Sequence, residues 1–422
     1  GRRYPLWIDD PRQVRQRKLL PVRLLRPGPD VEEEYKEWAK AASGGSTDEL
    51  IELVQLISSL RTRVANFNLP FLSLPVSTPA ETALDVFVKM NTSAQPLSTF
   101  DIVVAQVEAA TTESLHDLIE QLRRDAPGLE RFADPSDVVL AAAAYLQDKP
   151  ARRGIMLGEG FSRYLITHWD RLVSGARRAS SFLEEEGVFD AARLPTDPVI
   201  PMFVALWCDV PDGLDAEGNA RVVLRRFLWR SFLTDRYERS SNTRALADFK
   251  ALCGLVQGED GPVPGVFDED AHQVPSPEEL LSAGWPKKKD RLARAIMLVS
   301  LRSGGLDLAD GRSATHEALG LREYHHIFPV AYLKERGHAD HEIFRALNCA
   351  LISWRTNRTI SAKSPETYIK ERAGASNLGE AEIRRRLASH LIDLDWLARG
   401  DYAAFLRDRA ALIAEHARGL CA

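Results

Sequence analysis

One segment breaks an otherwise helical sequence: Tyr324-His325-His326-Ile327-Phe328-Pro329. Its β-prone residues predict a short strand that stops at the proline, which has no backbone N–H to donate to a ladder. The run Asn348-Cys349-Ala350-Leu351-Ile352-Ser353 predicts a second short strand. Further on, Ser364-Pro365 has the pattern of an N-cap followed by proline at the first helical position, and predicts a helix to Arg372. Strand, loop, strand and helix in this order indicate a small α+β unit.

The remainder of the chain favours helices. A capping box at 46–49 opens an apolar run, and Ser98 with Asp101 has the same form. Spacing of apolar residues predicts further helices over 81–90, 115–122, 138–146, 199–207, 222–233, 290–301 and from 401 onward. A β-prone stretch, 67–74, contains Pro70. We therefore expect a mainly α protein, built of helical domains, with one small C-terminal α+β unit.

Composition limits the class of protein. The chain has 422 residues, 45% apolar and 27% charged, typical of globular proteins with two or three domains. It has no apolar run of about 18 residues, so no membrane span is expected. Four scattered cysteines form no C-x-x-C pair, which argues against a cysteine zinc site and favours the cytoplasm. The chain begins without Met, so we expect it to be part of a longer protein.

Four ranges are expected from these patterns. Residues 1–110 form a helical N-terminal region with the short β-prone stretch, and 111–257 form a helical connector domain. Residues 258–277 are rich in glycine, proline and acids and predict an exposed linker. Residues 278–422 contain the α+β unit with flanking helices.

The adjacent histidines are the first chemical signal. Successive side chains on a strand point to opposite faces, so one imidazole of His325 and His326 could hold a metal while the other faces a substrate. Taken singly, such a pair is more typical of packed or solvated residues, Asn348 of a turn and Asn357 of a helix cap. However, these residues occur in one consistent order with Pro329 and the helix start at Ser364-Pro365, and this combination favours a nuclease site.

This string resembles the HNH (ββα-metal) nuclease motif: His325-His326-Ile327-Phe328-Pro329, then Asn348, then Asn357. It is most similar to the C-terminal HNH branch of GmrSD-like, modification-dependent (type IV) restriction enzymes. Residues 87–98, FVKMNTSAQPLS, resemble the end of the N-terminal domain of that family, with Ala94 or Gln95 where glycine is usual. The family's D-G-Q-Q-R nucleotide-binding motif is absent and would lie upstream. The resemblance covers roughly 15–110 and 220–375.

The resemblance implies a role for each residue. His326 is the general base, His325 and Asn357 hold one divalent cation, and Asn348 fixes the first strand by hydrogen bonding. Arg358 and Lys363 contact phosphate oxygens. Residues 321–375 contain nine Lys/Arg and six Asp/Glu, a local charge of +3 in a chain of −5. Many relatives have a carboxylate in place of His325, and an imidazole there favours Mn²⁺ or Ni²⁺ over Mg²⁺.

The expected function is a metal-dependent DNA endonuclease of a bacterial anti-phage restriction system that cuts phage or modified DNA. An NTP would act only through the upstream part. Homo-oligomers and partner proteins of a modification system are compatible with the resemblance. Two alternatives stay open: a non-catalytic DNA-binding or scaffold subunit that retains the fold, and an RNase that uses the same site.

Overall fold

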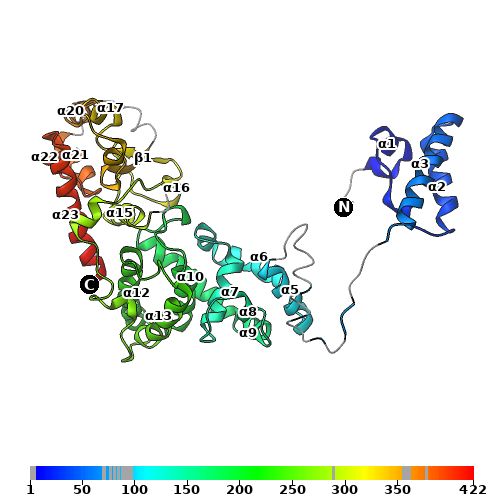
Figure 1. Cartoon of the computed structure of the whole chain (residues 1–422), viewed down its shortest axis with the longest axis horizontal. Coiled ribbons are helices and arrows are strands. Elements are labelled where there is room, and N and C mark those ends of the chain that lie inside the picture. Colours follow the sequence, from blue (N-terminus) through cyan, green and yellow to red (C-terminus); the bar gives the residue numbers. More distant parts are fainter. Residues whose placement is uncertain are drawn as a thin grey trace. The chain divides into compact units, whose positions relative to one another are not determined.

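The computed structural model describes residues 6–68, 73–75, 78, 82, 86, 98–287, 290–353, 363–375 and 379–422. The protein is mainly α, as expected, and the described residues form one two-stranded sheet. The chain divides into two compact units, Gly1–Asp85 and Val86–Ala422 (Figure 1).

The first unit is a small helical assembly. Ser46 caps its longest helix by accepting a hydrogen bond from the backbone N–H of Glu49 at 3.4 Å. The core of this unit is formed mainly by α2 and α3, with Trp38, Leu53 and Ile57 buried. Its elements are η1 (Leu6–Asp9), α1 (Pro11–Gln16), η2 (Val22–Leu25), α2 (Val31–Ala42) and α3 (Thr47–Ala65).

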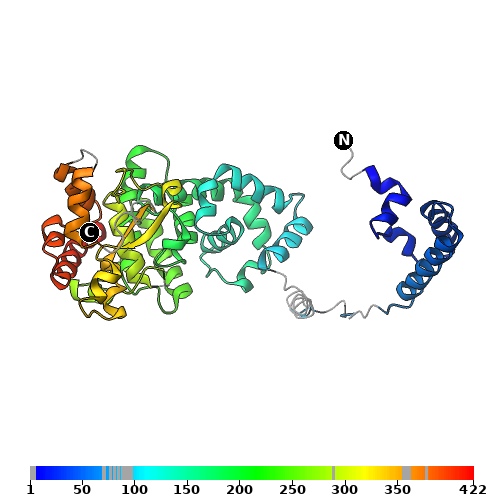
Figure 2. The ribbon, with the colours of Figure 1, turned by 90° about the horizontal axis from the view of Figure 1, so that it is seen from above.

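The second unit is a larger helical body with the hairpin near one end. Figure 2 shows its cyan helices at the end opposite the orange and red ones. Up to residue 281 its elements are α5 (Thr99–Ala110), α6 (Leu115–Asp125), η3 (Pro127–Arg131), α7 (Pro135–Tyr145), α8 (Arg153–Met156), α9 (Phe161–Thr167), α10 (Trp169–Glu185), η4 (Ala191–Arg193), α11 (Val199–Asp209), α12 (Leu214–Leu233), α13 (Ser241–Val256), η5 (Gly265–Phe267) and α14 (Pro277–Leu281). They are followed by α15 (Arg291–Arg302), α16 (His316–Leu319), β1 (Arg322–His326), α17 (Val330–Lys334), α18 (Asp340–Ile343), η6 (Ala346–Asn348), β2 (Cys349–Ser353), α20 (Pro365–Ala375), α21 (Gly379–Ala388), α22 (Leu394–Ala398) and α23 (Tyr402–Cys421).

Most predicted helices of this unit are present, and several begin directly after a capping side chain. Ser98 and Asp101 form a reciprocal capping box at α5. Asp290 and Asp401 accept backbone hydrogen bonds at the starts of α15 and α23. The predicted β-prone stretch 67–74, helix 81–90 and the family-like segment 87–98 lie largely outside the described residues.

The segment 258–277, where we expected an exposed linker, is exposed at 258–263 and 268–271 and buried around Val266. Val266 and Phe267 are buried, and the guanidinium of Arg230, 1% exposed, donates to the carbonyls of Val266 at 2.7 Å and His272 at 2.8 Å. Glycine and proline exclude regular helix here, but the carbonyls they leave unpaired are satisfied by a buried arginine. One hydrophobic core continues across this segment, with Leu228 and Ile296 both in it.

Both predicted strands are present and pair antiparallel. His325 lies opposite Ala350, and His326 opposite Cys349. The first strand ends at His326 rather than at Phe328, because the chain after it bonds to Asn348 instead of continuing the ladder. The predicted helix is α20, and the hydroxyl of Ser364 accepts from the N–H of Thr367 at 3.3 Å.

The last helix, α23, ties the hairpin to the helical body. In Figure 1 it runs from the hairpin end of the unit down beside α15 and α12. Arg409 on this helix is fully buried and donates to the carbonyls of Leu347 and Cys349, at 2.6 and 2.8 Å, and of His390 at 3.0 Å. Within the described part of the chain, no helix combines the length and apolarity needed to cross a membrane.

Candidate functional site

The two faces of the hairpin carry the two histidines into different surroundings. Residues directly opposite in an antiparallel pair share a face, so His325 shares that of Ala350 and His326 that of Cys349. Ala350 belongs to the smaller core that includes Tyr368 of α20. Cys349 belongs to the large core of the helical body. The hairpin therefore directs the imidazole of His325 towards the α20 side and that of His326 towards the helical body.

His326 is enclosed by aromatic rings. Its imidazole stacks on Trp285, with ring centroids 4.0 Å apart and planes 14° from parallel. Phe344 meets the imidazole edge-on at 4.8 Å. The Nε2 atom of His326 is buried, and no described residue forms a hydrogen bond with it. Burial, with a smaller contribution from His325, lowers the pKa of His326 to about 4, so the ring is neutral at neutral pH.

Asn348 joins the chain on both sides of the loop between the strands. It is fully buried, and its Oδ1 accepts from the N–H of Phe328 at 2.8 Å. Its Nδ2 donates to the carbonyls of Phe328 at 3.2 Å and Ile343 at 3.1 Å. The side chain thus holds the exit of β1 in place, which is the bonding that the sequence implied for it; a part in catalysis stays a prediction.

The expected metal site lies only partly within the described residues. Asn357 and Arg358 fall outside them, and His325 is 6% exposed on the side of α20. The described residues contain no group of three His, Cys, Asp or Glu side chains placed to hold a metal ion. His325 and Asn357 fit a divalent cation in donor type, since an imidazole and an amide leave most coordination positions open, as a catalytic site needs.

The local positive charge is largely engaged within the protein. Lys363 pairs with Glu371 on α20, so the phosphate contact expected of it competes with a carboxylate. Arg322 is buried and donates to the carbonyls of Gly305 and Arg312. Further pairs are Lys334 with Asp340 and Lys370 with Glu366. The carboxylates of these pairs are already subtracted in the local charge of +3, so pairing leaves the net charge unchanged and only limits which of these cations can turn to a phosphate.

Sequence reasoning missed Trp285 and Phe344. Two helices, α15 and α16, separate Trp285 from the motif in the sequence, and it reaches His326 only through tertiary packing. Phe344 lies between the two strands in the sequence and is 38% exposed. An aromatic residue at this position does not by itself indicate contact with His326. No local spacing rule connects either residue with the histidine.

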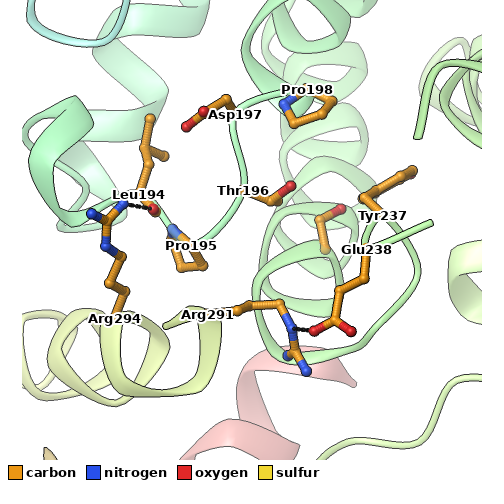
Figure 3. Close-up of a pocket in the computed structure, with 10 residues that line it drawn as sticks. Leu194, Pro195, Thr196, Asp197, Pro198, Tyr237, Glu238, Arg291 and Arg294 are labelled. Carbon is orange, nitrogen blue, oxygen red and sulfur yellow. Dashed lines mark hydrogen bonds and ion pairs between the residues drawn. The ribbon is translucent and has the colours of Figure 1, made fainter. Parts of the chain in front are cut away.

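A cavity of about 410 Å³ lies elsewhere in the second unit, between the 194–198 loop, the turn after α12 and α15 (Figure 3). Two arginines line it, but the Nε of Arg291 donates to Glu238 at 2.8 Å and Arg294 donates to the carbonyl of Leu194 at 2.8 Å. With Asp197 also in the lining, its charges balance. This cavity favours no class of ligand, and neither histidine of the motif lines it.

Comparison with known proteins finds a distant relative. The chain is 22% identical over 382 residues to an uncharacterized protein, MJ0686, of Methanocaldococcus jannaschii. The similarity covers 86% of this chain and 61% of the relative, so the chain spans about three-fifths of that protein's length. No protein-family model matches the chain.

Proposed function

We propose that this chain is a metal-dependent endonuclease of the HNH type that hydrolyses phosphodiester bonds in DNA. The observation that carries the proposal is the hairpin itself. Two short antiparallel strands place adjacent histidines on opposite faces, Asn348 bridges the loop between the strands, and a helix follows. This order of strand, loop, strand and helix supports the resemblance, and Asn357, the remaining residue of the motif, lies outside the described residues.

The residues of the chain divide the chemistry between the two faces. His326, neutral at neutral pH, accepts a proton from the water that attacks phosphorus, through an imidazole nitrogen. Asn348 keeps the base in place by holding the backbone of Phe328. Arg358 and Lys363 contact the phosphate oxygens.

His325 and Asn357 would hold a divalent cation, Mg²⁺, Mn²⁺ or Ni²⁺. When bound, the cation supplies neutralisation of the charge that builds on the phosphate and leaving oxygen.

The wider setting belongs to the same proposal. A GmrSD-like enzyme acts in the cytoplasm on phage or modified DNA within a restriction system, and uses a nucleotide through a domain upstream of the residues present here.

One observation favours the alternative of a non-catalytic, DNA-binding or scaffold subunit. His326 stacks on Trp285 with its Nε2 atom buried, and a general base must reach its water molecule. The nuclease proposal therefore requires that this ring becomes accessible.

The test is nicking of supercoiled plasmid by this chain in Mg²⁺, Mn²⁺ or Ni²⁺, with EDTA as the metal-free control. We expect nicking that His326→Ala reduces about 100-fold or more, the usual contribution of a general base. His341→Ala, an exposed histidine of the same region, serves as the matched control and leaves the rate unchanged. Equal nicking by the wild type and His326→Ala rules out the assignment, and a parallel assay on RNA decides between DNA and RNA.

A further inference from the structure

The geometry around His326 conflicts with the task proposed for it, and the conflict points to a moving part. A stacked ring blocks one face of the imidazole, an edge-on ring lies against it, and its Nε2 atom is buried. Phosphate groups on a nucleic acid backbone cannot enter this space while Trp285 occupies it. His326 as a whole is partly exposed, but access of a phosphate group to its Nε2 atom requires displacement of Trp285.

Trp285 lies on a short segment, residues 282–287, that has no helix or strand. Besides the edge-on contact of the Trp285 ring with Phe344 at 5.7 Å, two hydrogen bonds join the segment to the chain before β2: Arg345 donates to the carbonyl of Ser282 at 2.8 Å, and the N–H of Ala346 donates to the carbonyl of Ala283 at 3.2 Å. A third joins the N–H of Gly284 to the carboxylate of Asp290 at 3.0 Å. These bonds all precede Trp285 in the segment, so its ring can leave the imidazole without breaking them.

The segment also carries charge that a polyanion would attract. Lys287 is exposed and lies two residues after Trp285. The sequence continues with two further lysines. Attraction between Lys287 and phosphate groups acts on the same short piece of backbone that holds Trp285 over His326.

We infer that residues 282–287 form a lid in which Trp285 covers His326 and from which a nucleic acid, bound through Lys287, withdraws it. This inference rests on the proposed function and deepens it: the site is closed in the free protein and is opened by its own substrate. The lid keeps water and stray phosphate esters from the base until a polyanion binds.

The first test measures access to His326 without any cleavage. Diethyl pyrocarbonate modifies accessible neutral imidazoles, and peptide mass spectrometry reports the rate for each histidine. In the free wild-type protein we expect His326 to react at least about tenfold more slowly than exposed His341. Trp285→Ala raises the rate at His326 towards that of His341, whereas Trp285→Phe, which restores a stacking ring, keeps it low.

Trp396→Ala is the matched control, because Trp396 is a half-buried tryptophan on α22 and stacks on an arginine rather than on a histidine. It leaves the modification of His326 unchanged. A His326 that reacts as fast as His341 in the wild type overturns the lid, as does a rate that Trp285→Ala does not change in a variant with wild-type circular dichroism.

The second test asks whether nucleic acid moves the lid. The eight tryptophans are labelled with 5-fluorotryptophan, and Trp285→Phe assigns the Trp285 signal in ¹⁹F NMR spectra. Duplex DNA added in EDTA shifts that signal and leaves Trp396 in place. Lys287→Glu raises the DNA concentration needed by about threefold or more, because it replaces one attractive charge by a repulsive one.

An unmoved Trp285 signal at DNA concentrations that saturate a gel shift, or no binding of DNA at all, overturns opening by nucleic acid. Nicking separates this inference from the proposed function. If Trp285→Ala exposes His326 and DNA moves Trp285, yet no variant nicks plasmid with any metal, the lid stands and the nuclease assignment fails.

Discussion

The two faces of the β1–β2 hairpin place adjacent residues in contrasting surroundings. His325 faces the small core that includes Tyr368 of α20, whereas His326 faces the helical body and lies between aromatic rings. Two strands of five residues each are enough to separate the histidines, because side chains alternate along a strand. The comparison shows that the hairpin determines the direction in which each imidazole points. The residues packed on each face determine how accessible that imidazole is and whether it carries a proton.

The largest effect is expected when each histidine is removed in turn. His325→Ala and His326→Ala each lower plasmid nicking about 100-fold or more, but for different reasons. His325→Ala raises the Mn²⁺ concentration for half-maximal binding at least about tenfold, since even the outer partners of metal ligands are worth that much. His326→Ala leaves Mn²⁺ binding intact. Electron paramagnetic resonance of free Mn²⁺ measures both, and identical metal affinities in the two variants would break the comparison.

A large loss of stability is expected from Arg409→Met. The substitution removes four hydrogen bonds, three to the carbonyls of Leu347, Cys349 and His390, which stay buried without that donor, and one to the hydroxyl of Ser300. Such a loss costs about 3 kcal/mol in free energy of unfolding, measured by urea denaturation. Exposed Arg407 on the same helix gives the control Arg407→Met, with a change within about 0.5 kcal/mol. Equal effects would show that α23 does not anchor the hairpin through its buried arginine.

Acid should destabilise the second unit through His390. Burial lowers the pKa of this histidine from 6.5 to about 4, and its Nε2 bonds to the carbonyl of Leu306 at 2.7 Å. The folded protein therefore binds a proton less readily than the unfolded chain. The contribution of the buried, neutral His390 to the free energy of unfolding is complete above pH 6.5. It decreases as the pH falls towards 4, by up to about 3 kcal/mol. Denaturation at a series of pH values, compared with His390→Gln, measures the difference; parallel curves contradict it.

A smaller loss of stability is expected when Asn348, which bonds to the chain after β1, is replaced. Asn348→Ala removes one acceptor and two donor contacts from buried backbone groups, which costs about 2 kcal/mol in free energy of unfolding. Asn348→Asp keeps the acceptor for Phe328 but places a carboxylate against two carbonyls, so it rescues no stability. Thermal unfolding monitored by circular dichroism measures both variants. Rescue by aspartate would show that only the bond to the N–H of Phe328 matters.

Local patterns predicted much of the fold because their causes are local. The pair Ser98 and Asp101 marked the start of α5, the spacing of apolar residues marked α15 and α23, and the β-prone runs marked both strands. The segment 258–277 shows the limit of such reasoning. Glycine and proline correctly excluded a long helix, but burial depended on Arg230, which lies on another element.

The same limit applies to the site. The order His325, His326, Asn348 and the alternation of the two imidazoles follow from the sequence, since strand periodicity and the hydrogen-bonding capacity of an amide are properties of the residues themselves. Tertiary structure alone decided that Trp285 covers His326, that Lys363 pairs with Glu371, and that Arg409 holds the start of β2. Each of these depends on which distant side chain fills a given space or satisfies a given charge, and packing of the whole unit determines that choice.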